Sequence, residues 1–560
     1  MKRIIAILLA LLLLAGCAVT PVADTSQPPS DTTAPETTTA TEIPTTEPDV
    51  ARITLSDADI TWQLPADMAA SAVSLSHDII YYEDRDTYES GNPYGEGTAA
   101  DRHPQEEAQT HTVVNITQPG TYRLSGTLSQ GQIRVDLGED AFEDPNAVVT
   151  LILDGVDITC TAAPAILFLN VFECDNQWST ETATSTVDTS AAGANVILED
   201  GTVNNIAGSY VAKIYKDTDE GKKLYKQDGA IYSYMSMNVD GGGTLNLSGG
   251  NEGLDTELHL TINGGNINIL ADNDGINTNE DGVSVTTING GTLHIVAGLG
   301  AEGDGIDSNG FLVINGGTVI SSANPKSDAG LDSDLGSYVN GGTVIALGST
   351  MDWAESDSQQ VTMNLQFAAY RDSGDAIVVA KEDGTVVFAY DPSEDEVLSG
   401  NQRSFMGAVI SCPDFQVGDT YEVFLGGTVI GTETGGVYDV STITAYTDGV
   451  KQLYTGTDVG MGCPGGMGGR PDGMDGKPDG QQPPEKPEGE FEFDGQEPPK
   501  GEGEMRPDGT APDRNPPEGD QPMRPDGSAP AADFSGGVTS TQFFMQDKVN
   551  CFSGVTDAVE

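Results

Sequence analysis

The sequence has 560 residues and a formal net charge of −62 at pH 7. So large an acidic excess excludes nucleic acid as a partner, because nothing in the chain could offset the repulsion of the phosphates, and it disfavours unassisted binding to anionic membranes. Hydrophobic residues make up 37% of a chain that also holds 69 glycines and 30 prolines, a composition that predicts a strand-rich fold with unstructured segments.

The N-terminus has the features of a secretion signal. Lys2 and Arg3 precede an apolar stretch at residues 4–14, and the small residues that follow end at Cys17. This pattern resembles the signal of bacterial lipoproteins, so we expect residues 1–16 to be removed and Cys17 to be lipidated on sulfur. An ordinary signal peptide with an incidental cysteine is the alternative. We expect the protein to be tethered to the extracellular face of the cell membrane, because no other run approaches the ~20 apolar residues that cross a bilayer.

The next segments lead into the main domain. Residues 17–50 are almost entirely Thr, Pro, Ser, Ala and acids, which predicts an extended linker that buries no core. Residues 51–111 are expected to form an N-terminal cap with a charged insertion. Strand–turn units begin at Thr112, and we expect residues 112–360 to form the main domain. Within it, the lysine-rich stretch 207–229 is expected to be a protruding loop.

A glycine-pair phrase recurs in the main domain. Each pair is followed by Thr or Asn and then by a short alternating apolar run, and the pairs follow one another at steps of 22, 26, 26 and 25 residues. The five pairs begin at Gly242, Gly264, Gly290, Gly316 and Gly341. A period of this length is typical of solenoids, and two-residue alternation predicts strands. The pattern therefore predicts an all-β fold, a right-handed parallel β-helix with one coil per repeat.

The repeat also predicts which residues stack. One apolar residue of each copy is expected to form a core column: Leu245, Ile267, Leu293, Val319 and Val344. The asparagine before a glycine pair is expected to form a hydrogen-bonded ladder at the turn instead of a row of ligands. These asparagines are Asn263, Asn289, Asn315 and Asn340.

A second phrase lies between the glycine pairs and reads acid, glycine, apolar residue, Asp or Asn. Its copies are Glu252–Asp255, Asp274–Asn277, Asp304–Asp307 and Ala329–Asp332, the last with its acid displaced to Asp328. Neighbouring strand residues face opposite sides. We therefore expect the apolar members to point into the core and the final members to form an outer ladder.

Such a ladder brings like charges close together. Adjacent rungs lie about 4.8 Å apart, and two unit charges at that distance repel by about 3.5 kcal/mol at an effective dielectric constant near 20. A dense column of carboxylates favours a hard divalent cation, and ligands that are all oxygen indicate calcium. A solvated acidic surface is the alternative. The expected ligands are Asp255, Asp272, Asp274, Asn277, Glu302, Asp304, Asp307, Asp328 and Asp332.

The glycine pairs stop after Gly348. Residues 361–455 contain strand-like runs and predict a β-rich C-terminal cap. Residues 456–533 are rich in Gly, Pro, Asp and Glu, which predicts disorder. Residues 534–560 include a strand-like stretch, so we expect the chain to return to the cap and the disordered part to be a long loop.

The cysteines after Cys17 are five in number and widely scattered. An odd, scattered set fits neither a disulfide framework nor a zinc site. Most of them are expected to be small buried hydrophobes. A bridge between Cys160 and Cys174 is the alternative.

The two phrases in register resemble the bacterial carbohydrate-binding domain-containing family of calcium-binding parallel β-helices. Residues 120–126, 151–156 and 201–204 extend the resemblance, which covers about residues 116–348. It implies calcium-dependent binding of an acidic polysaccharide such as polygalacturonate or pectin, with cellulose as a further candidate. The chain departs from the family's acid–glycine pattern at Glu252 and Ala329.

Parallel β-helices also include lyases and hydrolases, so the fold alone does not decide between a binder and an enzyme. A lyase of this class needs a basic residue to take a proton, and Lys326 is the only Lys or Arg between residues 240 and 350. A hydrolase needs paired carboxylates, one of them protonated, but the basic residues that would hold a uronate are missing. His259 and His294 are expected to be surface strand residues.

We therefore expect a binder with no catalytic residues. A polysaccharide lyase or hydrolase of the β-helix type is one alternative. A structural or adhesive surface protein without a specific glycan is the other.

Overall fold

The computed structural model describes residues 49–82, 103–175, 179–217, 222–349, 352–459 and 539–559. The predicted signal peptide, Cys17, nearly all of the linker and nearly all of the predicted disordered loop lie outside these residues. The described residues belong to one unit, Pro48–Glu560. Among them, no helix is long and apolar enough to cross a membrane.

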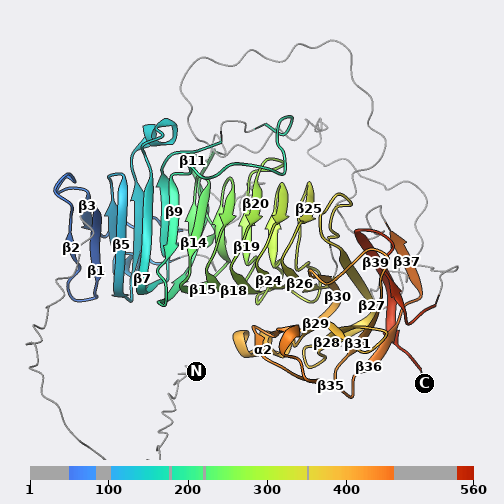
Figure 1. Ribbon diagram of the computed structural model, residues 1–560. Coiled ribbons are helices and arrows are strands. Elements are labelled where there is room, and N and C mark those ends of the chain that lie inside the picture. The colour runs from blue at the N-terminus through green and yellow to red at the C-terminus, as the bar shows by residue number, and fades with distance from the viewer. Residues whose placement is uncertain are drawn as a thin grey trace, which may run out of the picture. The chain divides into compact units, whose positions relative to one another are not determined.

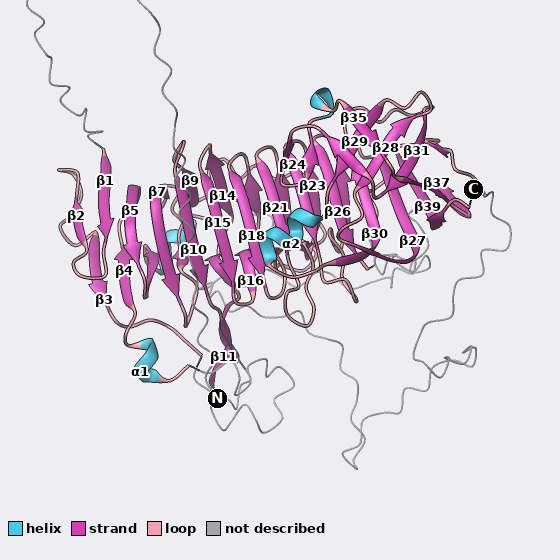
Figure 2. Cartoon of the chain, turned by 90° about the horizontal axis from the view of Figure 1, so that it is seen from below, coloured by secondary structure: helices cyan, strands magenta, loops and turns pink. Residues whose placement is uncertain are grey.

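The main domain is built from three columns of parallel strands, and the chain passes through the columns in turn (Figures 1 and 2). Two long strands near its start, β5 (Gly120–Leu128) and β7 (Val149–Cys160), each bend from the first column into the second. The first column continues through β9 (Ala194–Leu198), β14 (Met237–Gly241), β17 (Leu260–Ile262), β20 (Val285–Ile288), β23 (Phe311–Ile314) and β25 (Gly336–Val339).

The second and third columns follow the same parallel order. The second column contains β10 (Val203–Gly208), β15 (Thr244–Gly249), β18 (Asn266–Ala271), β21 (Thr292–Val296), β24 (Thr318–Ser322) and β26 (Thr343–Gly348). The third column contains β4 (Thr112–Ile116), β6 (Gly131–Asp136), β8 (Ile166–Asn170), β13 (Gly229–Ser233), β16 (Glu252–Thr256), β19 (Ile276–Thr278) and β22 (Ile306–Ser308). The protein is thus nearly all β, with large sheets rich in parallel pairs, as the sequence predicts.

The predicted core column is confirmed. Its five residues pair directly, strand to strand, along the second column. All five are fully buried: Leu245, Ile267, Leu293, Val319 and Val344. One apolar residue per repeat therefore fills one layer of a core that continues through the main domain.

The glycine pairs turn the chain from the first column into the second. Gly291, the second member of its pair, has φ of 84°, a left-handed conformation that glycine adopts without strain. The asparagine ladder beside these turns is also confirmed. The Nδ2 group of Asn289 donates to Oδ1 of Asn263 at 2.8 Å, and those of Asn315 and Asn340 each donate to the preceding asparagine at 2.9 Å.

Antiparallel strands close the N-terminal end of the stack. The first strand, β1 (Val50–Leu55), pairs in parallel with β5 and antiparallel with β2 (Thr61–Gln63). On the third column, β3 (Val73–Ser76) pairs antiparallel with β4. Two short helical turns, α1 (Gln105–Ala108) and η1 (Glu139–Glu143), lie between the early strands. The predicted protruding loop contains an antiparallel hairpin, β11 (Val211–Asp217) with β12 (Lys222–Gln227).

The C-terminal cap begins where the parallel order ends. There, β30 (Ser404–Ser411) pairs antiparallel with β26. The last strands return to this cap as expected, because β39 (Val549–Asp557) pairs with β27 (Thr362–Asp372) and β38 (Phe543–Phe544) pairs with β31 (Thr420–Leu425). Its other elements are β28 (Ile377–Lys381), β29 (Val386–Tyr390), α2 (Ser393–Ser399), β32 (Thr428–Ile430), β33 (Glu433–Thr434), β34 (Val437–Tyr438), η2 (Val440–Thr442), β35 (Ala445–Thr447), β36 (Val450–Leu453) and β37 (Gly456–Val459).

Two buried polar side chains of the cap fasten it to the main domain. Asp395 of α2 is fully buried, accepts a hydrogen bond from the Tyr390 hydroxyl at 2.8 Å, and lies 2.9 Å from Nε2 of His294 on β21. The guanidinium of Arg403 donates to the backbone carbonyls of Ala297 and Ala323. Since a buried charge is costly unless it is hydrogen-bonded, these contacts fix where the cap sits.

The alternative of a disulfide between Cys160 and Cys174 is wrong. Cys160 and Cys174 are both free thiols, as is Cys412, and Cys160 and Cys412 are buried. Cys551 on β39 is disulfide-bonded and is therefore an exception to the prediction of buried free cysteines.

The core column yields a test of the stacking. Replacing Leu293 by Ala should lower the free energy of unfolding by about 2–5 kcal/mol, because both neighbouring rungs lose contacts to a fully buried side chain. The matched control is Val203→Ala on β10, in the same column of strands, at a side chain that is 54% exposed. This substitution should change the free energy of unfolding by less than about 0.5 kcal/mol. Urea unfolding followed by circular dichroism measures both, and equal effects would contradict the assigned register.

Candidate functional site

The predicted acidic ladder lies on the third column in the expected order. Asp255 on β16 pairs with Asn277 on β19, which pairs with Asp307 on β22. An isolated bridge from Ile306 to Leu331 places Asp332 next in the row. The apolar partners in the same phrase point into the core, as predicted, so that strand alternation sends these four polar side chains to the outer side.

A second row of acids runs beside the first. The N–H of Gly253 donates to the carbonyl of Asp274 at 3.0 Å, and the N–H of Gly275 donates to that of Asp304 at 3.0 Å, which keeps Glu252, Asp274 and Asp304 in register. Glycine is required here because a Cβ at Gly275 would collide with the Ile295 side chain and with the next glycine's carbonyl. Close packing between columns thus explains the glycine of the phrase.

In both rows, burial differs between the first members and the later ones. Glu252, Asp255, Asp274 and Asn277 are 3%, 0%, 8% and 6% exposed. By contrast, Asp304, Asp307, Asp328 and Asp332 are half-buried. The expectation of an outer ladder is therefore wrong in one respect, because its first members are covered. Asn279 reaches back to donate to Oδ1 of Asp255 at 2.5 Å, and the β11–β12 hairpin ends at the fully buried Gln227, directly before Asp228.

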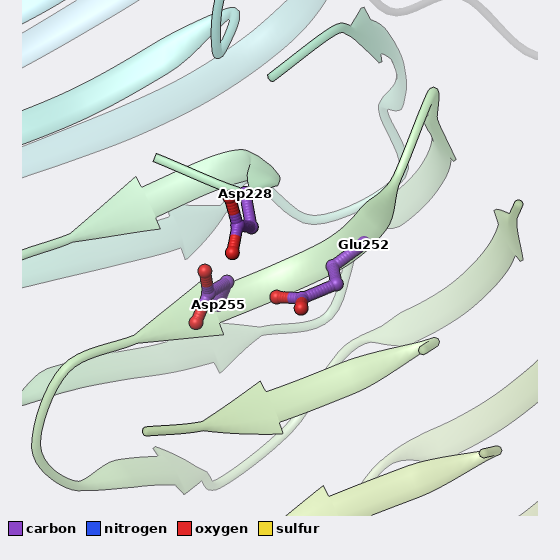
Figure 3. A group of neighbouring side chains, drawn as sticks. All are labelled: Asp228, Glu252 and Asp255. Carbon is purple, nitrogen blue, oxygen red and sulfur yellow. The ribbon is translucent and has the colours of Figure 1, made fainter. Parts of the chain in front are cut away.

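Three carboxylates converge at this covered end of the rows. Asp228, immediately before β13, joins Glu252 and Asp255 of β16, and a carboxylate oxygen from each lies within 4.8 Å of the other two (Figure 3). Two oxygens on opposite sides of a calcium ion would be about 4.6–5.2 Å apart, since calcium–oxygen distances are 2.3–2.6 Å. The spacing and the all-oxygen donor set therefore fit calcium.

Asn277 lies beside this group. Its Nδ2 group donates to Oε1 of Glu252 at 3.1 Å and to Oδ2 of Asp274 at 3.5 Å. Its Oδ1 atom is buried and accepts no hydrogen bond from the described residues. A buried amide oxygen without a donor is costly, and a cation would satisfy it. Asn277 is therefore a fourth candidate ligand.

The remaining acids of the rows raise one another's pKa values. Burial, together with the carboxylates of Glu252 and Asp307, raises the pKa of Asp274 well above its usual range. Burial raises the pKa of Asp304 to about 8, with further contributions from Asp332 and Asp307. Backbone donors orient these groups: the N–H of Asp304 donates to Oδ1 of Asp274 at 2.6 Å, and the N–H of Ala329 donates to Oδ1 of Asp304 at 2.5 Å.

Sequence reasoning missed two members of the converging group. Glu252 appeared as a departure from the family pattern. Asp228 precedes it by 24 residues, close to the period of the repeat, but lies in the stretch 207–229 that the sequence assigns to a protruding loop. The Asp228–Gly229 dipeptide, which repeats the acid–glycine order, is the signal that could have found it. Asp272 and Glu302 are exposed and do not belong to the converging group among the described residues.

The two histidines of the main domain are not surface residues, which corrects the expectation. His259 is 1% exposed; its Nδ1 accepts from the N–H of Val285 at 3.1 Å, and its Nε2 lies 3.2 Å from Oδ2 of Asp175. His294 does point away from the core of the coils, but the cap covers it and Asp395 contacts it. Segments distant in sequence bury both imidazoles.

Comparison with known proteins assigns the chain to a family. A family model described as "Carbohydrate-binding domain-containing protein" matches residues 110–407, more than half of the sequence. The chain belongs to this family. A protein of the same description from Acetivibrio thermocellus is 33% identical over 159 residues, which are 28% of this chain and 45% of that protein. The chain thus matches less than half the length of this relative.

A solved structure also resembles the chain. It is described as a polysaccharide lyase-like protein from C. thermocellum, in a gadolinium derivative, and is 24% identical over 52% of this chain and 92% of that chain. The TM-score is 0.31, which is too low to support an inference about function.

The raised pKa values predict how stability depends on pH when divalent cations are removed. Asp304 titrates near 3.9 in the unfolded chain and at about 8 in the folded protein. The folded state therefore binds more protons between these values, so stability should fall as pH rises from about 4 to about 8. In EDTA, the melting temperature should be higher at pH 5 than at pH 8.

Calcium should remove much of this pH dependence, and Asp304→Asn should reduce it in EDTA. The control is Asp59→Asn at an exposed aspartate of the N-terminal cap, which should leave the slope unchanged. Differential scanning calorimetry at several pH values makes the measurement. A melting temperature in EDTA that rises steadily from pH 5 to pH 8 would contradict the prediction.

Proposed function

We propose that this protein is a non-catalytic, calcium-dependent binder of acidic polysaccharide, such as polygalacturonate or pectin. The observation that carries the proposal is the pair of in-register acid rows on the third column, converging on Asp228, Glu252 and Asp255. Membership of the carbohydrate-binding domain-containing family supports the ligand class. The proposal includes the winding of the three columns as a right-handed parallel β-helix over residues 112–348.

Charge explains why a cation is needed. A chain with net charge −62 repels polyuronate, and the rows themselves present oxygen ligands. A bound calcium ion would supply positive charge and coordination positions that sugar carboxylates can fill, since it accepts six to eight oxygens and often keeps water. The chain's own role is to hold its carboxylates in place through backbone N–H groups.

The burial pattern suggests two kinds of cation position. Glu252, Asp255 and Asn277 are buried, so an ion held there with Asp228 would mainly stabilise the fold. Asp307 and Asp332 are half-buried, so an ion beside them is accessible to a polymer. Stability and ligand binding should therefore respond to different substitutions.

The placement of two possible acid–base groups, the imidazoles of the main domain, supports binding without catalysis. Both His259 and His294 are buried and contact Asp175 and Asp395. An imidazole held in this way is poorly placed to reach a polymer at the surface. We propose further that lipidation at Cys17 tethers the protein to the extracellular face of the cell membrane, so that its only membrane contact is the lipid.

The test is retention of the secreted chain on pectin. With calcium, de-esterified pectin should retain the protein, whereas EDTA should abolish retention and methyl-esterified pectin should bind at least about tenfold more weakly, a loss of about 1.4 kcal/mol. Equal retention of both pectins would mean that any calcium is structural only. Release of unsaturated oligosaccharides would instead identify a lyase.

Paired variants separate the two cation positions. Asp307→Asn with Asp332→Asn should abolish retention and leave most of the calcium-dependent rise in melting temperature. Glu252→Gln with Asp255→Asn should remove most of that rise, because an ion that binds only the folded state stabilises it. Asp59→Asn with Asp200→Asn, at two exposed sites, is the charge-matched control and should change neither property.

A further inference from the structure

A groove of about 800 Å³ lies on the outer face of the first column, away from the acid rows of the third. Its size falls within the range of roughly 300–1,000 Å³ that is typical of ligand sites. Strands β14, β17, β20, β23 and β25 supply most of its floor, and residues 185–190 form a wall at one end. These strands lie side by side along the stack (Figure 1). A groove lined by all of them therefore runs along the axis of the repeats.

Two parallel rows of side chains make the floor. The first row has one residue from each strand in direct register: Asn195, Asn238, Thr261, Thr287, Val313 and Tyr338. The second row, two residues further along the chain at each rung and so on the same face, begins with Ile197 and Asp240 and continues as the asparagine ladder. Six rungs at about 4.8 Å give a floor roughly 24 Å long.

Hydrogen bonds fix the wall to the floor. The Thr189 hydroxyl donates to Oδ1 of Asn238 at 2.8 Å and lies 2.7 Å from the Thr261 hydroxyl. The amide of Asn238 returns a bond to the Thr189 carbonyl at 2.8 Å. Thr189 is itself buried. The wall is therefore part of the folded structure, and the groove is formed before any ligand arrives.

The ladder leaves hydrogen-bonding capacity facing the groove. Asn289 donates one N–H to Asn263 and accepts one bond from Asn315 at its Oδ1. Each such amide retains a second N–H and a second lone pair, and Asn289 and Asn315 are exposed. A row of paired donors and acceptors, repeated at each rung, suits a ligand that carries many hydroxyl groups.

The charges of the lining select against acidic ligands. Among the described residues that line it, the charged ones are Asp188, Asp240 and Asp357, and none is a Lys, Arg or His. A uronate carboxylate would be repelled here with nothing to offset the cost. At the far end, the half-exposed ring of Tyr338 lies 6.3 Å from that of Phe311, centroid to centroid, and offers an aromatic surface to a sugar ring.

We infer that this groove binds an uncharged, linear polysaccharide lying along the stack of coils. The amide ladder and Thr287 contact its hydroxyls, and Tyr338 stacks on one of its rings. This second site rests on the proposed polysaccharide binding and not on its calcium dependence. The protein thus has two glycan-binding faces, one for acidic chains and one for neutral chains.

Calorimetric titration of the secreted chain tests the inference. The probes are cellohexaose, mannohexaose and xylohexaose as uncharged hexasaccharides and hexagalacturonate as the acidic one, each with calcium and with EDTA. At least one uncharged probe should bind equally well in both buffers, whereas hexagalacturonate should not bind in EDTA. If no uncharged probe binds, the inference is overturned.

Substitutions locate the binding. Thr287→Arg places a long side chain on the floor and should abolish binding of the uncharged probe. Its matched control is Thr292→Arg, on the same coil but outside the groove. Tyr338→Ala should weaken binding by about tenfold, because the stacking of the ring on a sugar is lost. Tyr338→Phe should retain the affinity, and Tyr370→Ala, at a 52% exposed tyrosine of the cap, should have no effect.

The two proposals can fail separately. Binding of hexagalacturonate in calcium reports on the third column and should survive Thr287→Arg. Binding of the uncharged probe reports on the groove and should survive Asp307→Asn with Asp332→Asn. Uncharged binding that is insensitive to Thr287→Arg, in a variant whose melting temperature is unchanged, would overturn the inference and leave the acidic site unaffected.

Discussion

The in-register stacking of parallel strands is the constraint on which the rest of the structure depends. Each residue of a repeat lies about 4.8 Å from its equivalent on the next rung. A side chain at one position of the repeat therefore forms a continuous row of similar side chains along the stack. Rows of leucine and isoleucine form a continuous core. Asparagine gives a hydrogen-bonded ladder, because an amide both donates and accepts. Aspartate gives repulsion, which adds to the effect of burial in raising the pKa values of Asp274 and Asp304.

The repeat is also why much of the fold could be predicted. The core column, the asparagine ladder and the order of Asp255, Asn277 and Asp307 all follow from a period of constant length, which sets the register without reference to distant segments. The site is less predictable. The convergence of Asp228 on Asp255 depends on an inserted hairpin, and the burial of His294 depends on a helix 101 residues away. The Asp228–Gly229 dipeptide hints at the first of these contacts, but no local pattern indicates which distant segment covers His294.

The three columns allow one chain to carry different chemistry on separate faces. The third column concentrates carboxylates, whereas the outer face of the first column presents amides and hydroxyls. The turns between columns keep these faces apart, since each glycine pair ends one strand and begins another. A side chain can therefore change on one face without altering the spacing on the next, and only the inward-facing residues are shared by all three.

The antiparallel strands at the two ends of the stack also affect how the protein can associate with other molecules. Antiparallel partners, β2 and β3 at the first strands and β30 at β26, occupy strand edges that would otherwise present unpaired N–H and C=O groups. An open edge of identical rungs is a template on which a second molecule can continue the sheet. The caps therefore do more than shield the core. They set a finite length for an otherwise extendable stack of strands and oppose end-to-end association of one molecule with the next.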